Sequence, residues 1–302
     1  MESRAIDAPQ YAAHFPRQPH PMSTASTKNV QLPENFTIPT MPAVVQRISR
    51  LLENPDVGLR EIAQVVSEDA PLAAKVLKIA NSTYYGLRER CISTHQAAAV
   101  LGIRVLKNVV TQASVIQQYD HLKGSGLDLD ELWRHSIVVG QASAFMMRRS
   151  KRKFDIGADE IYVCGLLHDL GQIVLLDNLK KRYIDLASKA RDLNIPLFLV
   201  EQQELGFNHA DVGARIATRW GLPPAVVQAI AYHHGPEVEV EKDPIVALTA
   251  RTNTLVQRVS SGNPAAASGV FGGRMGMLLA VGPEDETALI DFVQQALKSV
   301  ET

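Results

Sequence analysis

The chain has 302 residues, of which 46% are hydrophobic and 21% are charged, so its composition is that of an ordinary globular protein. The formal net charge of −1 excludes an overall basic field that would attract nucleic acid or acidic membranes, although it is compatible with a local charged patch. This length accommodates one large domain or two small ones.

Targeting and redox signals favour the cytoplasm. The first 22 residues contain no apolar segment of the kind found in signal peptides. No uncharged apolar stretch reaches the roughly 18 residues that a membrane helix needs. Cys91 and Cys164 lie far apart in apolar surroundings, which predicts reduced core thiols and no disulfide framework. We therefore expect a cytoplasmic protein with no membrane partner.

The first part of the chain is expected to be a tail followed by a helical unit. Residues 1–35 are rich in Pro, Ser, Thr, Gln and His, which predicts a disordered tail. Residues 36–123 show helical apolar stripes and form the predicted N-terminal subdomain. Its expected helices cover residues 43–52, 59–66, 71–80 and two segments between 94 and 119, with Gly102 between the last two.

A flexible break at residues 123–126 (KGSG) is the best internal boundary. After it, residues 127–262 are predicted to form a second helical subdomain. Its helices are expected at 130–149, 159–170, 178–193, 195–206, 209–220, 223–234 and 243–259. Residues 263–302 are predicted to form a loop, including GVFGGRMG, and a C-terminal helix from 283. No alternating strand pattern of useful length occurs, so the predicted class is all-α.

Metal-type ligands gather in the second part. It holds His135, His168, His209, His233 and His234, and Asp169 lies inside the apolar run GLLHDLGQIVLL. A lone buried histidine is usually a satisfied core residue, but this concentration predicts convergence on one cavity. Imidazoles with a carboxylate favour Zn, Mn or Fe. Since neighbours on a helix point in different directions, His168 and Asp169 can share an ion only beyond a helix end, which Gly171 makes feasible.

Several motifs carry a resemblance to known proteins. WRHS, GLLHDLGQ, FNHADVGARIATRWGLP and AIAYHHGP resemble the HD superfamily of metal-dependent phosphohydrolases. MPAVVQRISRLL, SEDAPLAAKVLKIANSTYYG and AAAVLGIRVLKNVV resemble the HDOD family, the HD-related output domain of bacterial signalling proteins. The likeness runs from about residue 33 to about 260, and it implies an HD-like helical bundle with an N-terminal helical subdomain.

The resemblance implies roles for the predicted ligands. His135 would be the first ligand, His168 and Asp169 would form the central pair, and Asp169 could bridge two ions. His209 and the His233–His234 pair resemble additional ligands of the HD-GYP relatives, which cleave cyclic di-GMP.

The chain departs from the catalytic pattern at two places. Arg251 and Asn253 stand in the region of the closing Asp, and Gln172 stands where HD-GYP enzymes have Lys. These three residues are therefore candidates for contacting a ligand or phosphate. A depleted ligand set costs metal affinity and water activation. The cofactor is expected to be either none or a divalent Fe, Mn or Zn ion.

The resulting expectation is a regulatory output or adaptor protein that works through contacts with signalling proteins and is not an enzyme. Cyclic di-GMP-linked signalling is a candidate pathway, and a small phosphorylated or cyclic-nucleotide ligand is a candidate partner. The alternative is a metal-dependent phosphohydrolase (a phosphodiesterase) of the HD superfamily, whose missing ligand comes from Asp243, Asn253 or water.

Two further features have simpler explanations. The helix pair at residues 59–80 has the shape of a DNA-binding module, but its second helix offers only Lys75 and Lys78, so nucleic acid is disfavoured. The basic run at residues 148–153 is expected to be a solvated helix end, with an acidic or phosphate-bearing partner as the alternative. ANSTYYG is expected to form a polar turn where the two parts meet.

Overall fold

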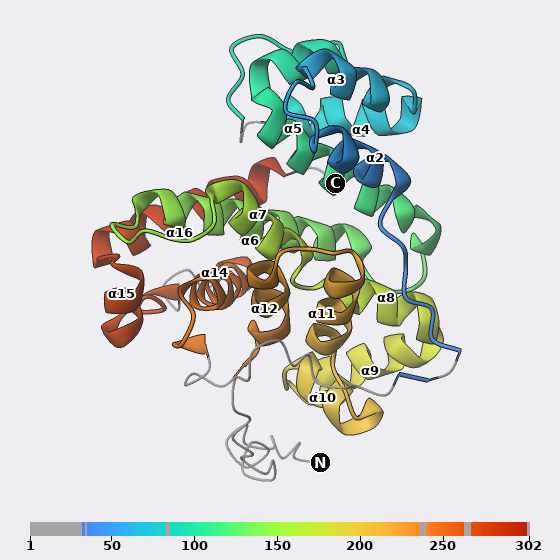
Figure 1. Ribbon diagram of the computed structural model, residues 1–302. Helices are drawn as coiled ribbons and strands as arrows, with labels where there is room; N and C mark the ends of the chain where they lie inside the picture. Colours follow the sequence, from blue (N-terminus) through green and yellow to red (C-terminus); the bar gives the residue numbers. More distant parts are fainter. Residues whose placement is uncertain (1–31, 34, 83–84, 236–239, 263–266, 301–302) are drawn as a thin grey trace, which may run out of the picture.

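The computed structural model describes residues 32–33, 35–82, 85–235, 240–262 and 267–300. Within these ranges the regular structure is helical, which confirms the predicted all-α class (Figure 1). The predicted tail falls almost entirely outside the described residues.

The N-terminal helices pack around a core of their own. That core includes Ile48, Ile62, Leu72 and Leu106, and its helices occupy the top of Figure 1. Asp69 caps the third of these helices by accepting a hydrogen bond from the backbone of Leu72, as expected for an N-cap carboxylate. The helices are α2 (Ala43–Leu51), α3 (Leu59–Ser67), α4 (Ala70–Ala80) and α5 (Thr94–Gln118).

Helix α5 joins the two parts of the molecule. Gly102, with φ 75° and ψ 169°, interrupts it at the predicted position, because glycine adopts positive φ without a Cβ penalty. After the kink, Val109 and Ala113 lie in the N-terminal core, whereas Val115 and Ile116 lie in the second core. Helix α5 is long and apolar enough to cross a membrane, but these contacts make it a core helix of the protein.

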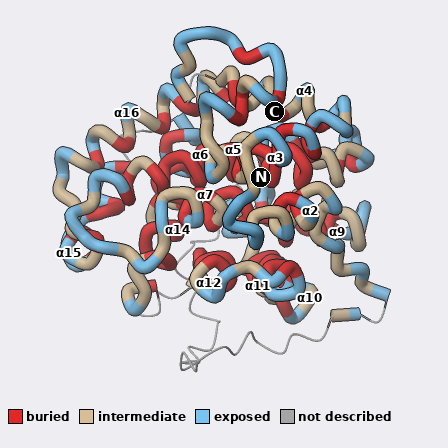
Figure 2. The backbone as a smooth tube through the Cα atoms, turned by 45° about the horizontal axis from the view of Figure 1, so that its top comes forward, coloured by how far each residue is buried: buried red, intermediate tan, exposed pale blue. Residues whose placement is uncertain are grey.

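The second and larger core is formed by the helices that follow (Figure 2). Helices α6 and α7 approach closely where Gly140 faces Gly165, since a Cβ on either glycine would meet the backbone of the other helix. The helices are α6 (Leu129–Arg149), α7 (Ala158–Leu167), α8 (Leu170–Leu179), α9 (Lys181–Asp192), α10 (Leu197–Leu205), α11 (His209–Arg219), α12 (Pro224–Tyr232) and α14 (Pro244–Ser260), with a 3₁₀ turn η1 at Asp120–Leu122.

Two sequence predictions about helices were wrong. The helix expected at 159–170 ends at Leu167, and α8 begins at Leu170 inside the same apolar run. Because both segments are buried on all sides, the run gave no periodic signal for the break. The stretch GVFGGRMG was expected to be a loop, but α15 (Gly273–Leu279) starts within it and buries Met275 and Leu279.

The C-terminal segment packs on the end of α6. Helix α16 (Pro283–Ser299) carries Asp285, which pairs with Arg149 at 2.8 Å. Arg152 donates to the carbonyl of Leu278 at 3.0 Å. These two members of the basic run therefore bind the protein's own C-terminal segment.

Candidate metal centre

The break between α7 and α8 places His168 and Asp169 at a helix junction. Asp169 has φ −99° and ψ 7°, outside helical geometry, so its side chain departs from the direction that a continuous helix would impose. Gly171 follows and lies against the start of α11, where a Cβ would overlap the backbone carbonyl of His209. The chain thus brings Asp169 next to the first residue of α11.

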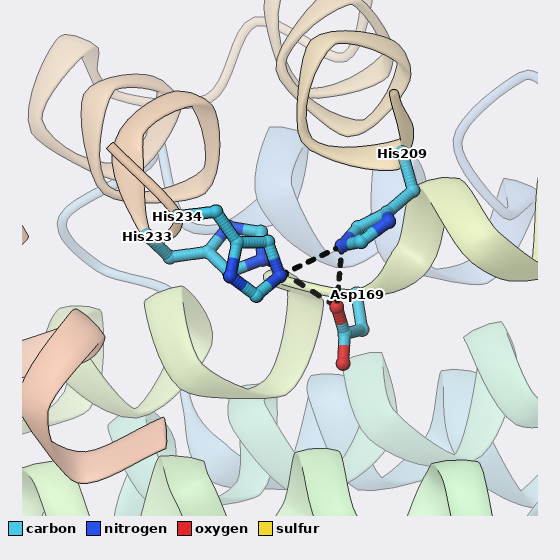
Figure 3. Close-up of side chains that lie close together, drawn as sticks. All are labelled: Asp169, His209, His233 and His234. Atoms are coloured by element: carbon cyan, nitrogen blue, oxygen red, sulfur yellow. Dashed lines mark hydrogen bonds and ion pairs between the residues drawn. The ribbon is translucent and has the colours of Figure 1, made fainter. Parts of the chain in front are cut away.

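The Asp169 carboxylate is the centre of a histidine cluster (Figure 3). Its Oδ1 lies 3.2 Å from His209 Nε2 and 3.5 Å from His233 Nε2. Its Oδ2 lies 3.0 Å from His168 Nε2 and 3.8 Å from His135 Nε2. His209 comes from the start of α11 and His233 from the end of α12, so the fold brings together histidines that are far apart in the sequence.

Backbone carbonyls orient two of these rings. His168 Nδ1 lies 2.6 Å from the carbonyl of Gly165, and His233 Nδ1 lies 2.7 Å from the carbonyl of Ile230. An Nδ1–H donor to a carbonyl leaves Nε2 as the unprotonated nitrogen, which is the form that ligates metals. Both Nε2 atoms and Asp169 Oδ1 are buried and have no hydrogen-bond partner among the described residues.

Glu201 of α10 orients the third ring, and the sequence analysis missed it. Its Oε2 lies 2.6 Å from His209 Nδ1 and accepts the backbone N–H of His209 at 2.9 Å. Its Oε1 accepts the Tyr183 hydroxyl at 2.6 Å. Such a carboxylate–histidine contact fixes ring orientation and raises ligand basicity in metal sites.

His234 completes one side of the cluster. Its Nε2 lies 3.1 Å from His209 Nε2, and its ring stacks on Phe198 with centroids 4.4 Å apart. Asp169, His209, His233 and His234 form one group of closely spaced ligand atoms, and His135, His168 and Asp169 form another. Asp169 belongs to both groups, as the predicted bridging role requires.

The charges of the cluster depend on one another. Burial alone would raise the pKa of Asp169, but nearby His168, His209 and His233 hold it well below its ordinary value. Burial alone would lower the pKa of His209, but Glu201 and Asp169 raise it to about 10. Burial lowers the pKa of His135 and of His233 to about 4 in each case. A metal entering the cluster therefore has to displace a proton from His209.

The residues present fit a divalent metal. The Nε2 atoms of His168 and His233 lie 3.0 and 3.5 Å from the buried Asp169 carboxylate, and a cation bound there would satisfy both nitrogens and the carboxylate at once. The nitrogen-rich donor set suits Zn, Fe or Mn. When bound, such an ion supplies Lewis acidity and activates water.

Asn253 lies at the edge of the cluster. Its Oδ1 lies 2.9 Å from His135 Nε2, so α14 presents an amide at this position. Arg251 lies two residues earlier, which turns it about 200° away around the helix. It is not one of the described residues that line the neighbouring cleft.

That cleft opens onto one side of the cluster. It has a volume of about 740 Å³, and His135, Asp169 and Gln172 form part of its wall. Arg191 of α9 lines the same cleft. Of the three predicted phosphate-contacting residues, Gln172 faces the cleft, Asn253 contacts His135, and Arg251 lies elsewhere.

Known proteins resemble this chain in sequence and in structure. A model of the HDOD domain matches residues 38–236. An HDOD domain protein of unknown function from Geobacter sulfurreducens has a similar structure, with a TM-score of 0.69, 23% identity, and coverage of 87% of this chain and 93% of that chain. A protein from Shewanella amazonensis SB2B named "Putative phosphohydrolase" gives a TM-score of 0.69 at 19% identity, covering 85% of this chain and 92% of that chain. At these identities the likeness shows the fold.

A curated relative is longer than this chain. An uncharacterized protein of Treponema pallidum is 29% identical over 231 residues, which is 75% of this chain and 44% of that protein. The chain therefore matches less than half the length of this relative.

Proposed function

The chain belongs to the HDOD family, and from this premise we propose that it is a regulatory signal-transduction protein whose histidine–aspartate cluster holds a divalent metal but does not support efficient hydrolysis. Asp169 and the surrounding imidazoles support metal binding, because their unpartnered atoms converge. Contacts with other signalling proteins would carry its output, in the cytoplasm and with cyclic di-GMP-linked signalling as a candidate pathway.

The observation that carries this proposal is the contact between His135 and Asn253. In the HD pattern, the region of Asn253 supplies a closing carboxylate. Here a neutral amide stands 2.9 Å from His135 Nε2, and the imidazole N–H can donate to Oδ1. A donor nitrogen is not a ligand, and a neutral amide contributes no charge to hold a second ion. The group formed by His135, His168 and Asp169 is therefore the weaker half of the cluster.

The test is elemental analysis of the purified protein together with assays on a simple phosphodiester and on cyclic di-GMP. We expect bound Fe, Mn or Zn that is lost in Asp169→Asn, and no turnover. Asn253→Asp restores a carboxylate, so we expect it to increase metal content and to produce phosphodiester cleavage. Asn194→Asp, on the wall of the same cleft, adds the same charge away from His135 and should do neither.

Metal binding would be contradicted if the purified protein contained no metal and its metal content were the same as that of Asp169→Asn. The second candidate is a metal-dependent phosphohydrolase, which the open cleft beside His135 and Asp169 favours, because a substrate could reach both residues. Turnover by the unmodified protein that disappears in His168→Ala would establish this alternative and exclude the non-catalytic role.

A further inference from the structure

A second cleft separates the N-terminal helices from α6. It has a volume of about 860 Å³ and lies between α4 with the segment after it, α5, α6 and the end of α16. Figure 1 shows that the end of α16 lies close to the N-terminal helices at this junction. None of the residues that line this cleft also lines the cleft beside the histidine cluster.

Two buried glutamines form part of its wall. Gln112 of α5 is 3% exposed and Gln141 of α6 is 4% exposed. Gln112 uses Oε1 to accept a hydrogen bond from the Tyr162 hydroxyl. Gln141 Oε1 is buried without a hydrogen-bond partner in the part of the chain that the structure describes. An unsatisfied buried carbonyl oxygen costs about 1–3 kcal/mol, so a protein that needed only packing here would gain from an apolar side chain.

Another polar side chain of the wall, that of Asn81, has partners of its own. Asn81 binds the backbone of Cys91 with both ends of its amide, at 2.8 and 2.9 Å. These two bonds hold together the two ends of the segment that borders the cleft. Gln141 Oε1 thus has no partner among the described residues and belongs to the wall of a preformed cleft.

The rest of the wall combines cations with an aromatic ring. Lys78 and Arg90 are exposed on the side of the N-terminal helices, and Tyr85 lines the same cleft. Glu89 is an acidic residue beside them, which leaves a net charge of +1 from these three ionic groups. Cations at the rim, a tyrosine and buried amides are the groups that bind a phosphate, a flat base and its hydrogen-bonding edge.

We propose that this cleft binds a purine nucleotide. A glutamine amide pairs through its adjacent donor and acceptor with the edge of a purine. Lys78 and Arg90 neutralise the phosphate, and the volume lies within the roughly 300–1,000 Å³ usual for small-ligand sites. The site is independent of the metal cluster and of the function proposed for it. A nucleotide here contacts both parts of the protein at once.

The test is titration calorimetry of the full chain with AMP and with GMP. The buffer contains EDTA, so that no metal bound at the histidine cluster can contribute to nucleotide binding. We expect saturable binding of at least one of them, and much weaker binding of ribose 5-phosphate and inorganic phosphate. Gln141→Leu should weaken the binding at least about tenfold. Gln257→Leu, on the wall of the metal-side cleft, is the matched control and should bind like the unmodified protein.

Arg90→Ala changes an exposed residue of the same cleft and should also weaken nucleotide binding. If Gln141→Leu does not fold, this variant tests the proposal in its place. The proposal is overturned if neither nucleotide binds at millimolar concentration, or if ribose 5-phosphate binds equally well. Equal loss of binding in Gln257→Leu would likewise overturn it, because the ligand would then occupy the other cleft.

Discussion

Glu201 and His209 form a buried carboxylate–imidazole pair that ties α10 to the histidine cluster. Glu201 Oε2 lies 2.6 Å from the ring Nδ1 and accepts the backbone N–H of the same histidine at 2.9 Å. The carboxylate is fully buried and also receives the Tyr183 hydroxyl. Glu201 thus fixes the position of His209 from another helix, and together with Asp169 it raises the pKa of that histidine.

Replacing Glu201 should weaken metal binding. We expect Glu201→Gln to reduce metal affinity about 10–100-fold, because the amide no longer fixes the ring or raises its basicity. The pKa of His209, now about 10, should fall toward its ordinary value, which NMR titration of the metal-free protein measures. Glu204→Gln is the matched control, since Glu204 is on the same helix and pairs with Lys189 at the surface. Equal affinity in both variants would contradict the role of Glu201.

Gly171 should tolerate no side chain. In Gly171→Ala the Cβ would overlap the carbonyl oxygen of His209, and backbone cannot yield as a flexible side chain can. We expect a loss of about 1–3 kcal/mol in the free energy of unfolding, measured by urea denaturation, together with reduced metal content. Gly157→Ala serves for comparison, because its Cβ meets only the end of the Glu160 side chain. A Gly171→Ala protein as stable as Gly157→Ala would argue against the close approach.

Removing the metal should lower thermal stability. A ligand that binds only the folded state at about 100 times its Kd adds about 2.7 kcal/mol. We therefore expect a chelator to lower the Tm of the metal-loaded protein in differential scanning calorimetry. Asp169→Asn has lost the shared carboxylate, so its Tm should not respond to the chelator. A chelator response of the same size in that variant would place the metal elsewhere.

The contacts that Asp285 makes at the N-terminus of α16, with Gly282 and with Arg149, should make stability depend on pH. The backbone N–H of Gly282 lowers the pKa of Asp285 below 3.8, partial burial opposes the shift, and Arg149 adds to it. A carboxyl whose pKa is lower when folded stabilises the protein above its unfolded pKa and loses this effect as the pH falls through the folded pKa. Asp285→Asn should therefore be about 0.3–1 kcal/mol less stable at pH 7, the usual contribution of a carboxylate in the first turn of a helix. The difference should shrink below pH 3.8, and a constant difference would contradict the assignment.

The sequence was sufficient for the helical class, for the kink at Gly102 and for the residues that meet at Asp169. Apolar periodicity and a glycine between two helical stripes indicated the first two features, and the concentration of histidines around Asp169 together with the resemblance to HD proteins indicated the third. It was insufficient for the break at His168, because a helix buried on all sides has no polar face to mark its end. Glu201 was missed for another reason: its role depends on a tertiary contact with His209. A signal did exist, since Glu201 lies four residues after Leu197 and four before Leu205, on an otherwise apolar line of the helix.

The DNA-binding alternative is weakened by a contact that spacing could not predict. Lys75 pairs with Asp120 at 2.5 Å, so one of the two lysines that the DNA-binding interpretation relied on is bound within the protein. Asp120 comes from the turn after α5 and meets α4 only through tertiary packing.

Helix α5 has a mechanical consequence. From residue 103 to 118 it is uninterrupted, a rod of about 24 Å whose first half is embedded among the N-terminal helices and which also packs on α7. A force that tilts the N-terminal helices must therefore bend this rod, rotate it as a unit or turn the chain at Gly102. In the first two cases the displacement reaches the helices that carry the histidines, so α5 acts as a lever between the two halves.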